Sequence, residues 1–219
     1  EELLEHMIDL GIKIQQIPAP TFFESDRAQF VFNQLANEKD LLVEFDPAGN
    51  VLGCLKGSNK STAPIIVSAH LDTVFPMNTN LRATRESDRI FGAGIGDNSM
   101  GVAGLFGLIW LLSKRNIRLK NDLWLAANVG EEGLGNLKGM QALVERFGDH
   151  SKAYIILEGL ALGQIYNRAL GVCRYLITIN TGGGHSWIDY GQPSAIHELA
   201  GLASRLASLA MPPKFRTTL

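Results

Sequence analysis

This 219-residue chain contains several short apolar runs, and each is followed by polar or acidic residues. The β-branched run Ile65–Val67 comes after Pro64 and predicts a buried strand. The runs Leu123–Val129 and Ala153–Leu157 predict two more buried strands, and Val102–Leu112 predicts an apolar helix. Because helical patterns separate the strands, the sequence predicts an α/β fold with a largely parallel sheet.

The N-terminal third of the chain supplies further elements. Apolar residues recur in steps of four and three over 3–17, which predicts an amphipathic helix that the next prolines end. Thr21 and Glu24 match a capping box for a second helix that runs to about Asn37. The remaining predicted elements are strands at 41–45 and 51–55 and helices at 136–147 and 195–209.

Composition excludes some classes of partner. The chain is 46% hydrophobic and 19% charged with a net charge of −2, so it can bury a core and gives no reason to expect nucleic acid or a membrane surface. Cys54 and Cys173 lie in apolar runs, which favours buried thiols in a reducing, cytoplasmic environment over a disulfide. The longest apolar run is about half of the ~20 residues that span a bilayer. Residues 82–89 interleave arginines with acids, which favours a solvated hairpin over a binding patch.

The strand predicted at Ile65–Val67 is followed by the sequence Ser-Ala-His-Leu-Asp, so His70 and Asp72 stand where this strand reaches solvent. Ligands of open α/β sheets bind at this carboxyl edge. A metal-bound imidazole usually donates its other N–H to a carboxylate or carbonyl, which is one interpretation of the pair. The other is a hydrogen-bonded turn with no ligand.

Asp97 lies in a glycine-rich turn directly before the apolar helix. The segment Gly-Ala-Gly-Ile-Gly superficially matches a dinucleotide fingerprint, but no strand–turn–helix unit starts the fold here and an acid inside the cluster would repel a pyrophosphate. We therefore interpret Asp97 as a cation ligand.

Glu131, Glu132 and Glu158 follow the other two strands. Each could simply be solvated. Together with His70 and Asp97, however, they would meet at one edge of a parallel sheet and repel one another without cations. Mixed nitrogen and oxygen ligands favour divalent metals, zinc above all. There are more acids than one tetrahedral ion needs, which suggests two ions and a spare proton acceptor.

Four segments also resemble a known family: VSAHLDTVFP, GAGIGDNSMGVAG, VGEEGLGNLKG and YIILEG. They resemble the dinuclear zinc metallopeptidases and aminoacylases, which include carboxypeptidases, desuccinylases and tripeptide aminopeptidases. The resemblance implies a three-layer αβα catalytic domain with a mostly parallel mixed sheet at 1–170. It also implies two Zn²⁺ ions, with Co or Mn as alternatives. The residue roles that it implies are metal ligation by His70, Asp97 (bridging), Glu132 and Glu158, support of His70 by Asp72, and general-base catalysis by Glu131.

The resemblance further implies that residues 171–219 begin an α+β lid that forms a homodimer, with a strand at Val172–Thr181. His185 would reach the partner's active site, although a polar residue in a glycine-rich loop is the alternative interpretation. The family's final histidine ligand would lie beyond Leu219, and His197 lies in the predicted lid helix and cannot replace it. We therefore expect a fragment or a truncated form.

Two functions remain open at this point. The first is metal-dependent hydrolysis of an amide bond in a small peptide or N-acyl amino acid by a metal-bridging water. The second is a non-catalytic homologue that keeps the fold for assembly or regulation.

Overall fold

A computed structural model describes residues 2–59, 61–159, 163–169, 171 and 175–209. Within it the chain divides into two compact units, Glu1–Arg174 and Tyr175–Leu219, which are treated separately below. Cys173 lies outside the described residues, whereas Cys54 is a buried free thiol.

The first unit contains a five-stranded sheet in the order β1-β2-β6-β3-β7. Its strands are β1 (Leu41–Phe45), β2 (Val51–Leu55), β3 (Ile65–His70), β6 (Leu123–Asn128) and β7 (Ala153–Ile156). Strand β3 pairs in parallel with both β6 and β7, while β2 pairs antiparallel with β1 and β6. Only β2 therefore runs against the others, which confirms the mostly parallel mixed sheet.

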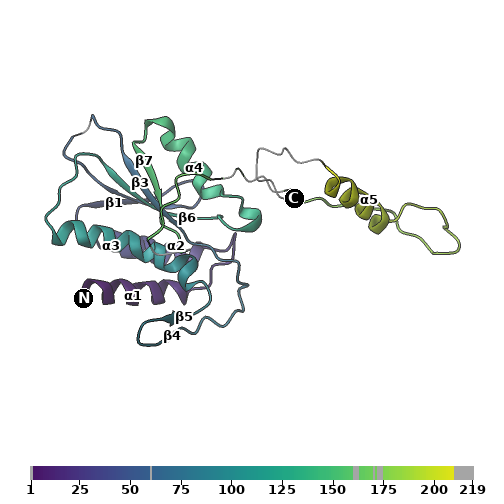
Figure 1. Cartoon of the computed structure of the whole chain (residues 1–219), viewed down its shortest axis with the longest axis horizontal. Helices are drawn as coiled ribbons and strands as arrows, with labels where there is room; N and C mark the ends of the chain where they lie inside the picture. The colour runs from purple at the N-terminus through teal and green to yellow at the C-terminus, as the bar shows by residue number, and fades with distance from the viewer. Residues whose placement is uncertain (1, 60, 160–162, 170, 172–174, 210–219) are drawn as a thin grey trace. The chain divides into compact units, whose positions relative to one another are not determined.

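Helices cover both faces of this sheet, as Figure 1 shows. They are α1 (Glu2–Gln15), α2 (Ser25–Ala36), α3 (Met100–Lys114) and α4 (Lys138–Phe147). The larger core joins α1, α2 and α3 to alternate sheet residues such as Val67 and Leu125. Leu143 of α4 packs on the opposite face against Leu52 and Ala126. The three layers follow from period-2 alternation in the strands and one apolar face on each helix.

Helix α3 is longer and more central than its apolar run predicts. With the preceding turn η1 (Ile95–Ser99), it forms a 20-residue stretch. Among the described residues this is the one helix long and apolar enough to cross a membrane, and half of it is buried inside the fold. It packs against α1 and β3. These contacts account for its apolar composition as that of a core helix.

Two local predictions need correction. The capping box at Thr21 is wrong: α2 begins at Ser25 without a side-chain cap, because the Thr21 hydroxyl donates to Asp72 instead. Helix α4 begins at Lys138, two residues later than predicted, because Asn136 and Leu137 have positive φ. The arginine-rich segment does form a hairpin, with β4 (Thr84–Arg85) and β5 (Ile90–Phe91), as predicted.

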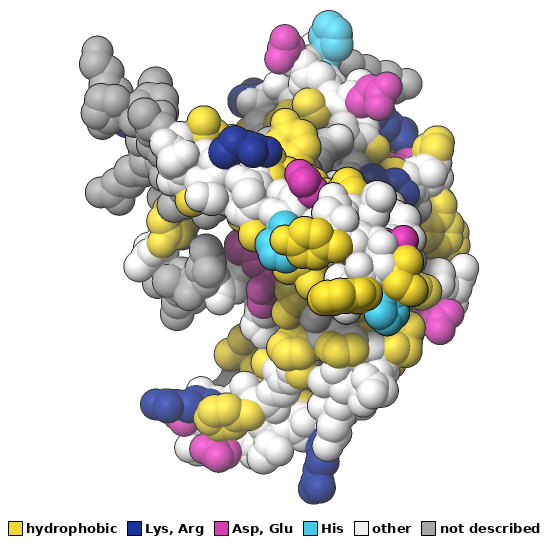
Figure 2. Space-filling view, turned by 90° about the vertical axis from the view of Figure 1, so that its right-hand side faces the viewer, with side chains coloured by type: hydrophobic (Ala, Val, Ile, Leu, Met, Phe, Trp, Pro, Cys, Tyr) yellow, Lys and Arg dark blue, Asp and Glu magenta, His cyan; other side chains and the backbone are white. Residues whose placement is uncertain are grey.

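In the second unit, α5 (Ala195–Ala207) is the helix that the sequence predicts. The predicted strand at Val172–Thr181 is wrong over its described part, because residues 175–181 have no regular structure and the described part of the second unit contains no strand that could pair with them. No residue of α5 is buried, and Trp187 is 86% exposed. Hydrophobic side chains also lie open on the molecular surface that Figure 2 shows.

Candidate metal centre

The carboxyl ends of the parallel strands carry the predicted ligands. His70 is the last residue of β3, and its register partner in β6 is Asn128, three residues before Glu131. Glu158 follows β7, and Asp97 lies in η1 next to the start of α3. The sheet therefore brings these segments to one edge, as the sequence predicts.

His70 is buried, and its two ring nitrogens face different groups. Nδ1 lies 2.9 Å from the backbone carbonyl of Asp72 and 3.6 Å from its Oδ1. Nε2 lies 2.9 Å from Asp97 Oδ1 and 3.6 Å from Glu158 Oε2. The Asp72 backbone thus holds one side of the ring, and the opposite nitrogen points at two carboxylates.

The charge around His70 is strongly negative. Burial by itself lowers the pKa of His70, but hydrogen bonding to Asp72 and Glu158 outweighs burial and raises that pKa to about 11. Burial raises the pKa of Glu158, yet its hydrogen bonds from His70 and the Gly159 amide lower it overall. Positive charge at this position is therefore stabilised, whether a proton or a metal ion supplies it.

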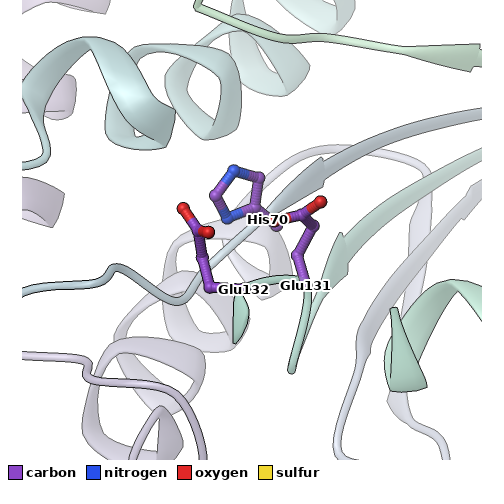
Figure 3. Close-up of side chains that lie close together, drawn as sticks. All are labelled: His70, Glu131 and Glu132. Atoms are coloured by element: carbon purple, nitrogen blue, oxygen red, sulfur yellow. The ribbon is translucent and has the colours of Figure 1, made fainter. Parts of the chain in front are cut away.

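Glu131 and Glu132 rise from one loop toward His70, as Figure 3 shows. Ligand atoms of these three residues lie within 4.8 Å of one another, and the same holds for His70, Asp97 and Glu158. Burial raises the pKa of both Glu131 and Glu132, and neighbouring carboxylates raise it further, whereas His70 lowers it. His70 thus belongs to two overlapping groups of candidate ligands.

Asp72 connects His70 to the glutamate loop. It is fully buried, and its two carboxylate oxygens accept the backbone amides of Glu131 and Glu132, each at 2.9 Å. The Thr21 hydroxyl donates to Oδ2 at 3.0 Å. Burial would raise the pKa of Asp72, but hydrogen bonding to His70 and to these amides lowers it. Asp72 is therefore held as a carboxylate at the base of the site.

Comparison with known families agrees with this geometry. Residues 50–187 match the family described as Peptidase family M28. The chain belongs to this peptidase family. A Mycobacterium tuberculosis protein, named provisionally as a succinyl-diaminopimelate desuccinylase (DapE), is 28% identical over 160 residues, 73% of this chain and 44% of that protein. The chain thus spans less than half the length of this relative.

Solved structures of several peptidases share the fold. Aminopeptidase PepT from Bacillus cereus has a TM-score of 0.58 and 24% identity, covering 70% of this chain and 43% of its own. A Staphylococcus aureus tripeptidase has a TM-score of 0.56 and 18% identity over 72% of this chain and 44% of its own. The Bacillus subtilis YXEP protein, described as a dinuclear metal-binding peptidase, has a TM-score of 0.52 and 17% identity. The match covers 71% of this chain and 42% of that protein. These structures confirm the α/β fold of the chain.

The side chains of the M28 site suit divalent cations. Each of the two groups offers one imidazole and two carboxylates, the ligand mixture that zinc accepts. Because Nδ1 of His70 faces the Asp72 carbonyl, Nε2 remains as its ligand atom, and it points at Asp97 and Glu158. The bridging role of Asp97 stays a prediction. So does the role of His185, which lies exposed in the second unit, where its Nδ1 accepts the amides of Trp187 and Ile188.

Sequence reasoning missed polar residues that support this site. Asn98, whose peptide bond to Asp97 is cis, is buried and donates to the Leu157 carbonyl at 2.8 Å, tying η1 to the end of β7. Gly159 lies so close to the Gly96 carbonyl that a Cβ there would collide with it. The local sequence GDNSMG does not predict this role, because the contact joins residues 59 positions apart along the chain.

Proposed function

We propose that the protein containing this chain is a metal-dependent hydrolase that cleaves an amide bond in a small peptide or an N-acyl amino acid. The observation that carries the proposal is the convergence of His70 with Asp97, Glu158 and the Glu131–Glu132 pair at one sheet edge. Membership of a peptidase family and the desuccinylase name of one relative support the same reaction class.

His70, Asp97, Glu132 and Glu158 would hold two divalent ions, with zinc as the first choice and cobalt or manganese as alternatives. When bound, such ions polarise a carbonyl and lower the pKa of a bridging water toward ~7. This division leaves Glu131 free for proton transfer.

Glu131 would act as the general base. Burial and the neighbouring carboxylates raise its pKa, and a base is most effective when its pKa approaches the working pH. Asp72 fixes the backbone of Glu131 by accepting its amide, so the carboxylate starts from a held position. It would take a proton from the water that attacks the amide carbonyl and pass that proton to the amine that leaves as the C–N bond breaks.

The second unit would contribute to assembly. We propose a homodimer through this unit, in which His185 of one chain supports the substrate carbonyl in the partner's site. The proposal is supported by the exposed His185 and by the open apolar side chains of the unit. A cytoplasmic location belongs to the same proposal.

The test is an assay of the full-length protein with dipeptides, tripeptides and N-succinyl and N-acetyl amino acids. We expect zinc or cobalt in the purified protein and turnover that a chelator abolishes and added metal restores. Bound metal without turnover of any of these amides would instead favour a non-catalytic homologue that keeps the fold for assembly.

A further inference from the structure

The loop that carries Glu131 and Glu132 is held by side chains from distant parts of the chain. Four consecutive backbone amides, Val129 to Glu132, each donate to a side-chain oxygen. Asp72 accepts the last two. The first two are accepted by Asn50 and Glu24, neither of which belongs to the two groups of candidate ligands.

Glu24 reaches this loop from the turn before α2. Its Oε1 accepts the Gly130 amide at 3.0 Å and the Phe22 amide at 3.0 Å. Glu24 is 7% exposed, so a buried carboxylate accepts hydrogen bonds from two backbone amides. Gly130 has φ +62°, a conformation that side chains disfavour, and this turn directs the next residue toward His70.

Asn50 holds Val129, the residue before Gly130 in the loop. It is fully buried directly before β2, and its Oδ1 accepts a hydrogen bond from the Val129 amide at 3.0 Å. Its Nδ2 donates to Asp46 Oδ2 at 2.7 Å and to the Gly139 carbonyl at 2.9 Å. One amide side chain thus joins the β1–β2 turn, the glutamate loop and the start of α4.

The other side of the loop is held as well. The carbonyls of Val129, Gly130 and Glu132 accept amides from Gly139, Lys138 and Gly135 at 2.8–3.0 Å. With both sides bonded, the backbone of this loop has little freedom. Catalytic groups must be held within a fraction of an ångström of their working positions. A loop bonded on both sides can hold the glutamate side chains in this way.

We propose that Glu24 and Asn50 are positioning residues that set the backbone from which Glu131 and Glu132 reach their substrate and metal. The inference rests on the proposed function, because it assigns those glutamates their roles. Glu24 acts through one accepting oxygen, and its charge is not required. Neither residue touches the reacting atoms.

Three substitutions at position 24 test this role in the full-length protein. Glu24→Ala removes the accepting oxygen, Glu24→Asp withdraws it by one methylene, and Glu24→Gln keeps an oxygen in place without the charge. Glu145→Ala, at an exposed position on α4, is the matched control. The readouts are amide hydrogen exchange over 127–135, cobalt affinity and spectrum, kcat and KM, and the melting temperature.

We expect Glu24→Ala to speed exchange over 127–135 by about tenfold, as the loss of one buried hydrogen bond would. Cobalt affinity or kcat should fall about 10- to 100-fold, while exchange in β3 and α3 stays unchanged. Glu24→Asp should follow in the same direction, and Glu24→Gln should behave like the unaltered protein. If Glu24→Ala does not fold, Glu24→Asp provides the same comparison.

Asn50→Ala should reproduce the faster exchange at Val129. Loss in Glu24→Gln equal to that in Glu24→Ala would overturn the proposal, because charge would then matter. Unchanged exchange, cobalt binding and kcat in both Glu24→Ala and Glu24→Asp would overturn it too. Exchange does not depend on turnover, so a protein that hydrolyses no amide but shows the loosened loop refutes the proposed function and leaves the positioning role intact.

Discussion

Helix α1 of the first unit and helix α5 of the second have similar sequence patterns but different surroundings. Both helices are amphipathic, and the sequence predicts both. Leu10 and Ile14 of α1 are buried, and the helix packs against α3. In α5, Ile196 is 79% exposed and Leu199 is 44% exposed. The comparison teaches that periodicity selects a helix, whereas burial requires a partner surface.

The same contrast applies to the candidate chemistry. In the first unit, His70 and Asp72 are buried and hydrogen-bonded to other segments, so their positions are set by the fold. In the second unit, the hydrogen bonds of His185 among the described residues join it to residues 187–189. Contacts with distant segments therefore set the positions of His70 and Asp72, whereas the described hydrogen bonds of His185 lie within its own loop.

The largest effect should follow from Glu131→Gln in the full-length protein. The amide keeps the shape of the side chain but cannot accept a proton, so we expect kcat to fall at least 10²- to 10⁴-fold with metal content retained. Metal analysis and steady-state kinetics measure both quantities. A parallel loss of metal would make Glu131 a ligand and exchange its role with that of Glu132.

His185→Ala asks whether the second unit takes part in the reaction. If His185 supports the substrate carbonyl, its loss should lower kcat about 10²- to 10³-fold with unchanged metal content. Mixing His185→Ala with Glu131→Gln chains should restore part of the activity, because each dimer could then contain one complete site. A normal kcat for His185→Ala would confine the chemistry to the first unit.

A pair of leucine substitutions measures the difference in packing. Leu125 is fully buried in β6, so Leu125→Ala should lower the free energy of unfolding by about 2–5 kcal/mol. Leu199→Ala on exposed α5 should change it by less than ~0.5 kcal/mol. Urea denaturation followed by circular dichroism gives both values. Equal losses would show that α5 is covered in solution.

Arg85→Ala should have the smallest effect. Its guanidinium lies 2.6 Å from Glu5 and links the β4–β5 hairpin to α1, but the two side chains are 43% and 50% exposed. Solvent screens such a pair, so we expect a change in unfolding free energy of less than ~1 kcal/mol. The same denaturation assay measures it, with Glu5→Gln as the companion variant. A larger loss would mean that the hairpin helps to hold α1 in place.

Much of the first unit could be predicted from local sequence. Strands β1 and β2 occupy the predicted residues, because turn residues limit them at both sides. The sequence also predicts the candidate ligands of the site, since each stands just before or just after an apolar run. The prediction of a helix cap at Thr21 and Glu24 is wrong, because both side chains bond to residues beyond position 70. The local pattern of a capping box does not show such distant contacts.

The sequence by itself determined the types and approximate bounds of the main elements of the first unit and the chemical identity of the candidate ligands, because spacing and turn chemistry act within a few residues. Only the tertiary structure decided the order β1-β2-β6-β3-β7 and the placement of the glutamate loop. That loop is bonded to Glu24, Asn50 and Asp72, up to 106 positions away along the chain. Contacts at such separation form only when the sheet has assembled, and hydrophobic periodicity does not encode them.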